Sequence, residues 1–268
     1  MPSGNVGIMK SKFEIVVIGA GNMATRLSLA LVEKGYAIKQ VYSRTTQSAQ
    51  MLATRLGGDV TFTNDTGSIY PDADLYLFSL SDNALPCVIE QIPANDALWI
   101  HTAGSMPMEV FTGKTSRYGV LYPMQTVSKE RETDWSEVPV FVEASNTDDE
   151  KLIEQIATTL SRNVQRINSQ QRQALHLAAV FACNFSNHMY AIAEKLLQEQ
   201  GLDFDVMKLL IHETERKAQI MSPLQAQTGP AVRNDENVMN KHLQLLTNSP
   251  EATLYKLISE NINKYKQQ

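Results

Sequence analysis

The sequence has few cysteines, no long apolar run and no excess of positive charge, and each shortage excludes a class of protein. Cys87 and Cys183 are its only two cysteines, too few for the disulfide framework of a small secreted domain. Both lie in apolar stretches and are predicted to be small core residues. No stretch reaches the ~18 consecutive apolar residues of a membrane-spanning helix. We therefore expect a soluble cytoplasmic protein without a membrane partner.

The balance of charge and the histidine pattern exclude two further classes. Lys and Arg number 24 against 29 Asp and Glu, a formal net charge of −5, whereas nucleic-acid-binding domains are usually basic. The five histidines are scattered, and no His-x-x-x-His or Cys-x-x-Cys pattern occurs, so neither nucleic acid nor metal is predicted. Residues 1–10 lack the apolar core of a signal peptide and are predicted to form a loose extension.

A glycine-rich turn stands between a predicted strand and a predicted helix. The apolar run 13–18 ends in Gly19-x-Gly21-x-x-Ala24, and an amphipathic helical pattern opens at once. Strand, turn and helix in this order are the context that a dinucleotide fingerprint requires. Gly19 permits the tight turn, Gly21 lets a pyrophosphate approach the backbone, and Ala24 fits where helix meets strand. The N–H groups and positive dipole of the helix start then attract the phosphates.

The end of the second strand predicts which dinucleotide binds. The strand 37–42 ends in Ser43-Arg44-Thr45, where an NAD enzyme usually carries an acid that binds the ribose 2′-hydroxyl. A guanidinium between two hydroxyls suits a 2′-phosphate instead, because it forms two parallel charge-assisted bonds. NADP is therefore the predicted cofactor. Its predicted binding residues are Gly19, Gly21, Asn22, Met23, Ala24, Ser43, Arg44, Thr45, Ser79, Leu80, Ser81 and Thr102.

The order of predicted elements indicates two domains. Strand and helix patterns alternate as far as residue 167, which favours a mainly parallel sheet. From residue 168 onward the pattern predicts helices only, over about 169–197, 203–221, 236–246 and 249–265. We predict an α/β fold: a doubly wound, mainly parallel Rossmann sheet over residues 1–167, followed by a smaller all-helical domain over 168–268. The stretch 174–197 is apolar on all sides and so predicted to be buried, and we expect a homodimer formed through this helical domain.

Several motifs together resemble a known family. Gly19-Ala-Gly21-Asn22-Met23 resembles the start of pyrroline-5-carboxylate reductases. The segments 101–105 (HTAGS), 122–126 (YPMQT), 176–184 (HLAAVFACN) and 228–235 (TGPAVRND) are similar to a Rossmann-like family of NADP oxidoreductases with a C-terminal helical domain of unknown function. The resemblance spans nearly the whole chain. It implies the fold and NADP but no particular substrate. One departure is Asn234, where the family often has glycine.

Residues for the chemistry should come from the fifth strand's end, from 122–126 and from the first helix of the second domain. His101 ends a predicted strand and is able either to polarise a carbonyl or imine or to bond neighbouring backbone. Ser105 and Thr102 suit the nicotinamide amide or a substrate carboxylate, but equally stabilise a turn. Arg172 suits an anionic substrate, although solvation at the surface is the default for an arginine.

His176 and Asn184 are the preferred site residues on the long helix. On an α-helix turning ~100° per residue, Asn184 lies within about 80° of His176. Polar groups on an apolar helix need partners. A substrate pocket provides them, as does a backbone carbonyl or a second subunit. His176 is the better proton donor, since histidine titrates near neutrality.

Three functions remain open on the sequence. The first is an NADPH-dependent oxidoreductase that transfers a hydride to or from a small carbonyl or imine compound. The second is an NADP-binding redox sensor or regulatory module without turnover. The third keeps catalysis but uses a deazaflavin as the bound redox group.

Overall fold

The computed structural model describes residues 13–266, so the predicted loose extension of residues 1–10 lies outside the described residues. The contacts divide the chain into two compact units, residues 1–183 and 184–268. This division falls inside the first predicted helix of the helical domain (about 169–197), whereas the predicted boundary at 167/168 follows the last strand. The two units are described separately below.

The first unit is built on one eight-stranded sheet in the order β3-β2-β1-β4-β5-β6-β7-β8. All neighbouring strands are parallel except β6 and β7, which are antiparallel. The predicted α/β class and mainly parallel sheet are confirmed. The strands are β1 Glu14–Ile18, β2 Ala37–Tyr42, β3 Thr61–Thr63, β4 Leu75–Phe78, β5 Leu98–His101, β6 Tyr118–Pro123, β7 Val140–Ala144 and β8 Val164–Arg166.

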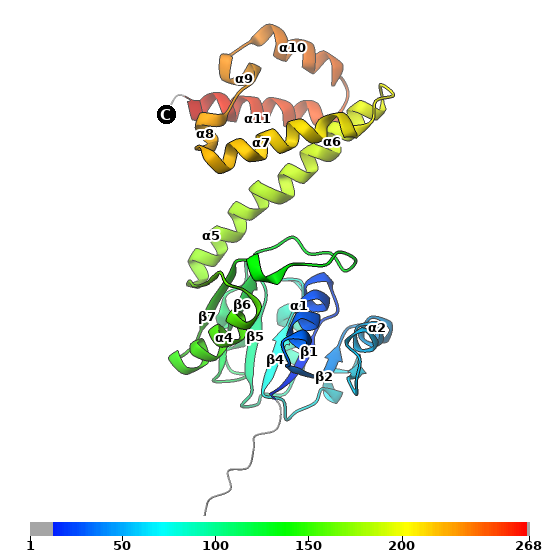
Figure 1. Cartoon of the computed structure of the whole chain (residues 1–268), viewed down its shortest axis with the longest axis vertical. Coiled ribbons are helices and arrows are strands. Elements are labelled where there is room, and N and C mark those ends of the chain that lie inside the picture. Colours follow the sequence, from blue (N-terminus) through cyan, green and yellow to red (C-terminus); the bar gives the residue numbers. More distant parts are fainter. Residues whose placement is uncertain (1–12, 267–268) are drawn as a thin grey trace, which may run out of the picture. The chain divides into compact units, whose positions relative to one another are not determined.

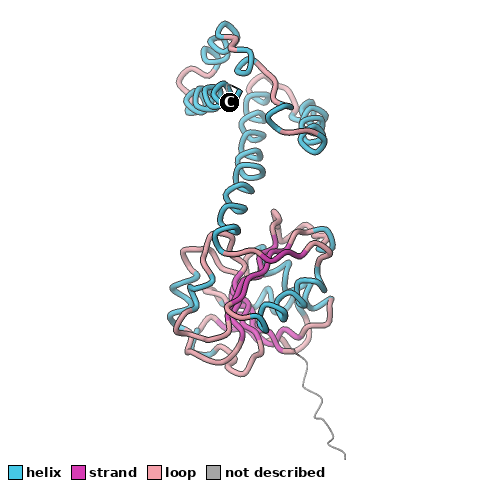
Figure 2. The backbone as a smooth tube through the Cα atoms, turned by 90° about the vertical axis from the view of Figure 1, so that its left-hand side faces the viewer, coloured by secondary structure: helices cyan, strands magenta, loops and turns pink. Residues whose placement is uncertain are grey.

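Helices cover both faces of this sheet, which explains why its central strands are continuous apolar runs. One core cluster joins alternate residues of β1, β4 and β5 to α1, α2 and α4, and the other joins the opposite residues to α3. Figure 2 shows the twisted sheet edge-on with helices on either side. The helices are α1 Asn22–Glu33, α2 Thr46–Leu56, α3 Leu85–Gln91, α4 Thr147–Leu160 and α5 Ser169–Ala179.

The second unit contains helices only within residues 184–266, as predicted. A π-helical segment, Val180–Phe185, joins α5 to the first of them (Figure 1). Asn234 adopts the left-handed conformation with φ 54°, which glycine and asparagine tolerate best, so an asparagine suits this position. The helices are α6 Ser186–Gln198, α7 Lys208–Ile220, α8 Pro223–Ala226, α9 Pro230–Arg233, α10 Glu236–Leu245 and α11 Pro250–Lys266.

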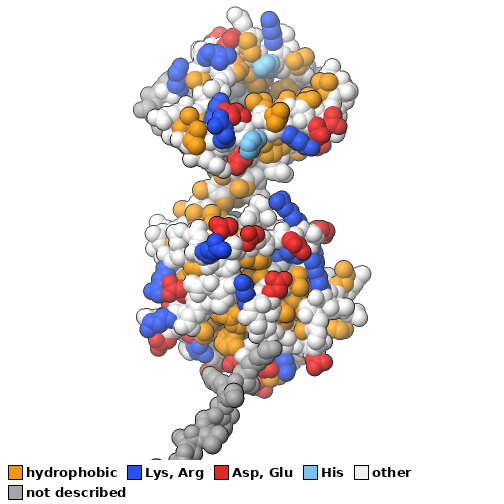
Figure 3. All heavy atoms as spheres, viewed as in Figure 1, with side chains coloured by type: hydrophobic (Ala, Val, Ile, Leu, Met, Phe, Trp, Pro, Cys, Tyr) orange, Lys and Arg blue, Asp and Glu red, His pale blue; other side chains and the backbone are white. Residues whose placement is uncertain are grey.

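Apolar side chains of the helical unit are largely exposed (Figure 3). Between residues 184 and 266 only Ala231 and Leu246 are buried, whereas Leu209 and Leu245 are 83% and 84% exposed. The burial predicted for residues 174–197 is thus not provided by the chain itself. The prediction that both cysteines are core residues is wrong, because Cys87 and Cys183 are exposed. Among the described residues, no helix combines the length and apolarity needed to cross a bilayer.

Candidate functional site

The glycine turn lies where β1 ends between β2 and β4. Gly19 donates its N–H to the carbonyl of Tyr42 at 2.8 Å, and Ser79 donates to the carbonyl of Ile18 at 2.8 Å. Gly19 has φ +123°, and a Cβ there would lie 2.2 Å from the Ser79 carbonyl oxygen. The turn therefore requires glycine at position 19 both for its backbone conformation and for its contact with the end of β4.

In contrast to position 19, no contact among the described residues requires glycine at position 21. A Cβ at Gly21 would meet no atom within 4 Å, so the missing side chain leaves open space in front of the helix. Gly21 is the N-cap of α1 and contributes no side-chain cap, so the first N–H groups of α1, including those of Asn22 and Met23, are available to an anion. Ala24 is fully buried where α1 meets the sheet.

A cavity of about 690 Å³ opens beside this turn. Arg44 lies in its wall with an exposed side chain, and Thr45 caps α2 by accepting the N–H of Ser48 at 3.4 Å. The predicted cofactor residues in the wall come from three loops that are separate in the sequence, those after β1, β2 and β4: Gly19, Gly21, Ser43, Arg44, Thr45, Ser79, Leu80 and Ser81. This convergence at the carboxyl ends of parallel strands is the arrangement of a dinucleotide site.

Two further predicted residues, Asn22 and Thr102, join this site by side-chain bonds. The Thr102 hydroxyl donates to the Ser79 hydroxyl at 3.2 Å, which ties the loop after β5 to the loop after β4. Asn22 donates its side-chain amide to the carbonyl of Val127 at 3.0 Å. The loop between β6 and β7 is thereby held over the first turn of α1.

Ser105 follows in the loop after β5. Its hydroxyl donates to the carboxylate of Asp82, and its carbonyl accepts the side-chain amide of Gln173 at 3.0 Å. The hydroxyl therefore already has a partner in the chain, and a substrate group would have to share or replace that bond.

His101 lies beneath the same loop, in the core. Its side chain is fully buried, and its Nδ1 accepts the N–H of Ala103 at 3.1 Å. Burial, with the nearby charge of Arg172, lowers the pKa of His101 to about 3, so the imidazole is neutral at physiological pH. Catalysis by His101 stays a prediction, against which this enclosure argues, because a substrate has no access to the ring. Its contacts instead support the loop.

His176 of α5 lies against the loop after β5. Its Nδ1 is 3.1 Å from the hydroxyl of Tyr122 on β6, and the two rings meet edge to face. A Cβ on Gly104 would lie 2.5 Å from the same Nδ1, so the imidazole packs directly on the backbone of the loop. His176 is half-buried. The structure thus brings His176, Gly104 and Tyr122 together beside Ser105 and Thr102.

Arg172, one helical turn before His176, is not the surface residue that the sequence suggests by default. It is 1% exposed and forms an ion pair with Glu143 of β7. It also donates to the carbonyl of Met106 and, at 3.1 Å, to the hydroxyl of Ser169. A buried arginine needs such partners. Arg172 therefore attaches α5 to the sheet, and with α5 it fixes the position of His176.

Asn184 belongs to the second unit, and its side chain is exposed. Its predicted position relative to His176 assumed an unbroken α-helix, but residues 180–185 are π-helical, which changes the rotation per residue. A catalytic role for Asn184 stays a prediction.

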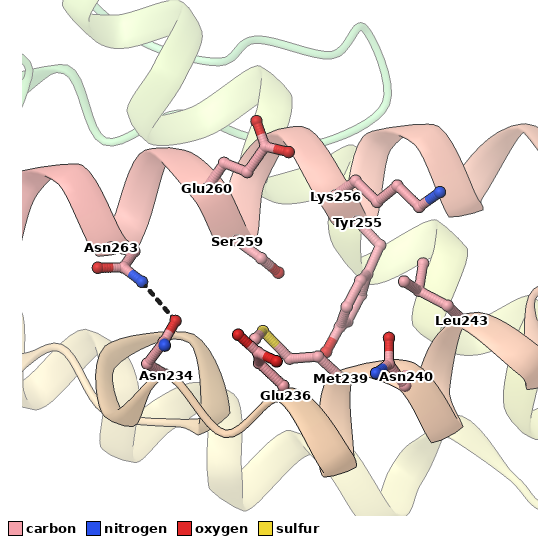
Figure 4. A pocket seen from close by; sticks show the side chains of 10 residues that line it. All are labelled: Asn234, Glu236, Met239, Asn240, Leu243, Tyr255, Lys256, Ser259, Glu260 and Asn263. Carbon is pink, nitrogen blue, oxygen red and sulfur yellow. Dashed lines mark hydrogen bonds between the residues drawn. The ribbon is translucent and has the colours of Figure 1, made fainter.

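A second cavity, of about 220 Å³, lies in the helical unit between α10 and α11 (Figure 4). Asn263 of α11 donates its side-chain amide to the side chain of Asn234 at 2.8 Å at one end of it. None of the residues predicted for chemistry lines this cavity. In residues 13–266, no three His, Cys, Asp or Glu side chains gather in a way that could hold a metal ion.

Comparisons with known proteins agree with this geometry. Residues 14–103 match the family described as NADP oxidoreductase, coenzyme F420-dependent, and residues 138–262 match a domain of unknown function (DUF2520). The structure of a "putative NADP oxidoreductase" from Bacteroides fragilis is 50% identical, with a TM-score of 0.87 over 94% of this chain and 98% of that one. No curated protein matches the sequence.

Two more distant structures share the fold alone. A reductive aminase from Aspergillus terreus, in complex with NADPH and ethyl levulinate, is 15% identical, with a TM-score of 0.65 over 95% of this chain and 90% of that one. A pyrroline-5-carboxylate reductase from Coxiella burnetii is 18% identical, with a TM-score of 0.55 over 96% and 98%. The 50% identity to the Bacteroides protein over nearly its whole length, with the two matching family models, shows that the chain belongs to the family of NADP oxidoreductases that carry a C-terminal helical domain of unknown function.

Proposed function

We propose that this protein reduces a small carbonyl or imine compound with NADPH. The observation that carries the proposal is the position of His176, whose imidazole packs on Gly104 in the loop after β5. That loop is bonded through Thr102 to Ser79, which in turn contacts the glycine turn. A side chain able to donate a proton thus lies beside the loops that border the nucleotide cavity.

The chain's own residues fit the cofactor. The open space at Gly21 and the uncapped start of α1 suit a pyrophosphate, and Arg44 in the cavity wall suits a 2′-phosphate. When bound, NADPH supplies a hydride.

The protein residues supply the proton. As the substrate carbon gains the hydride, the electron pair of the C=O or C=N bond moves to oxygen or nitrogen. His176 in its imidazolium form gives the Nε2 proton to that atom and is reprotonated by solvent. Ser105 and Thr102 hold the substrate or the nicotinamide amide.

A titration with NADPH and NADH, with and without a panel of small keto and imino acids, tests the proposal. We expect tight binding of NADPH, weak binding of NADH and oxidation of NADPH with at least one panel member. Tight binding without oxidation would favour the redox-sensor alternative. Because the matching family is described as coenzyme F420-dependent, a reduced deazaflavin belongs in the panel. Failure to bind either nicotinamide nucleotide would contradict the assignment of the glycine turn.

Arg44→Ala isolates the choice between the two nucleotides. Loss of the charge-assisted phosphate contact should weaken NADPH binding by about 10- to 100-fold and leave NADH binding nearly unchanged. Arg162→Ala is the control, because Arg162 is exposed and lies outside the cavity wall. Equal losses for both nucleotides would show that Arg44 does not contact the phosphate.

His176→Ala isolates the proton donor. Turnover should fall by about 10²- to 10⁴-fold, the usual contribution of a general acid, while the Kd of NADPH changes little. Wild-type turnover in this variant would show that His176 is structural only.

We also infer a homodimer formed through the helical unit. A unit of 85 residues (184–268) in which only two described side chains are buried lacks the apolar core that folding requires. A second copy offers the same apolar helix faces, and obligate dimer interfaces resemble such a shared core. The free, exposed thiols of Cys87 and Cys183 suit the reducing cytoplasm. A sedimentation experiment giving a monomer at micromolar concentration would contradict the dimer.

A further inference from the structure

Tyr122 is held in place beside His176, and the proposed chemistry gives it no role so far. The side chain is 7% exposed, and its ring packs near Phe141 on the neighbouring strand, 6.4 Å between centroids. Its hydroxyl oxygen lies 3.1 Å from Nδ1 of His176. Among the described residues, this nitrogen is the hydroxyl's one hydrogen-bond partner.

The direction of the bond follows from the state of the phenol. Burial raises the pKa of Tyr122 above its ordinary value, and the charge of Arg172 offsets only part of this increase, so the phenol keeps its proton. A buried hydroxyl that fails to donate loses a hydrogen bond, which costs about 1–3 kcal/mol. The O–H therefore donates to Nδ1 when the imidazole is neutral. The imidazole's own hydrogen must then be on Nε2.

Gly104 restrains the ring from another side. A Cβ at this position would lie 2.5 Å from Nδ1 and 2.6 Å from Cγ of His176. Glycine at position 104 thus lets the imidazole rest on the backbone of the loop after β5. Nε2 is at the far edge of the ring from both contacts.

We propose that Tyr122 is a positioning residue that, with Gly104, holds His176 as the tautomer with its hydrogen on Nε2 and directs that nitrogen to the substrate. The substrate half of this proposal rests on the proposed function; the tautomer does not. The pair also survives protonation, because the Tyr122 oxygen accepts a bond from Nδ1–H of the imidazolium. When the imidazolium gives up its Nε2 proton, the hydrogen on Nδ1 stays bonded to the Tyr122 oxygen, so the ring keeps its place until solvent reprotonates Nε2. Loss of the Nδ1 proton then restores the resting tautomer with its hydrogen on Nε2.

Tyr122→Phe removes the hydroxyl and keeps the packed ring. The direct readout is the ¹⁵N spectrum of the imidazole at about pH 9, well above the ordinary histidine pKa of about 6.5, with the His176 signals assigned by their loss in His176→Gln. We expect the Nε2–H tautomer in the wild-type protein and a mixture of both tautomers in Tyr122→Phe. Tyr118→Phe, four residues earlier on β6, is the matched control and should leave the spectrum of His176 unchanged.

The kinetic readout is kcat with the best substrate of the panel. It should fall by about tenfold or more in Tyr122→Phe, within the range of general acid catalysis, with the Kd of NADPH unchanged. Gly104→Ala should shift the His176 signals as well, because the new methyl displaces the ring. An Nδ1–H tautomer in the wild-type protein, or an unchanged tautomer in Tyr122→Phe, would overturn the proposal. A tautomer change in a protein that reduces no substrate would refute the reductase but leave the positioning role intact.

Discussion

At the scale of single residues, the two glycines of the turn have different reasons to be glycine, and this difference is measurable. Gly19→Ala forces a Cβ to 2.2 Å from the Ser79 carbonyl at φ +123°. It should lower the free energy of unfolding by about 1–3 kcal/mol or more, the usual cost of such strain. Gly21→Ala meets no protein atom within 4 Å, so its stability should match the wild type.

Gly21→Ala, the variant expected to be as stable as the wild type, is the one expected to lose nucleotide binding. Gly21→Ala should abolish tight NADPH binding in a fully stable protein, since the methyl fills the space reserved for the pyrophosphate. Urea unfolding and a fluorescence titration measure both quantities. A stable Gly21→Ala protein that binds NADPH like the wild type would show that the phosphates lie elsewhere.

His101 predicts a pH dependence of stability. Its pKa is lowered from 6.5 to about 3 in the folded protein, so below pH 6.5 the unfolded chain binds a proton that the folded protein does not. The stabilisation is complete above pH 6.5 and decreases as the pH falls toward 3, by up to about 1.4 kcal/mol per pH unit. His101→Asn keeps an acceptor for Ala103 and should lack this slope. Parallel curves for the two proteins would contradict the buried, neutral state of His101.

At the scale of elements, α5 depends on one buried ion pair for its attachment to the sheet. Arg172→Met leaves Glu143, which is 11% exposed in its side chain, without its counter-charge. The loss should be about 3–5 kcal/mol of unfolding free energy, and kcat should fall as well, because His176 follows on the same helix. Arg166→Ala is the control: its pairs with Glu150 and Glu154 involve a half-exposed arginine, so about 0–1 kcal/mol is expected. Similar losses of unfolding free energy in both variants would show that the buried Arg172–Glu143 pair contributes no more than an exposed pair.

The same helix shows where prediction from sequence ends. The strands, the glycine turn and the position of Arg44 in the cavity wall were predictable because their signals are local: an apolar run, a glycine spacing and a residue at a strand end. The burial of Arg172 was not, because it depends on Glu143 and Met106, which no local pattern connects to α5. The Tyr122–His176 bond likewise joins residues 54 positions apart. The one available signal was that both lie in motifs of the resembled family.

At the scale of the whole molecule, the sequence predicted burial for residues 174–197, and only the structure shows that the core of the described residues belongs almost entirely to the sheet unit. The error over the cysteines has the same origin. Apolar neighbours in the sequence indicate burial only where another element packs on them. Cys183 lies in the π-helical segment, where no residue is buried within this chain.

The last prediction uses this unequal distribution. Trp99 and Trp135, the only two tryptophans, are both buried in the sheet unit, so their fluorescence reports that unit, whereas circular dichroism also reports the helical unit. If two copies share the helical core, a hundredfold dilution removes about 2.7 kcal/mol from the folded dimer relative to unfolded monomers. The helical transition should then move to lower temperature on dilution, while the tryptophan transition stays in place. If the midpoint temperature of the helical transition does not change with protein concentration, this unit is stable without a second copy, despite its exposed leucines.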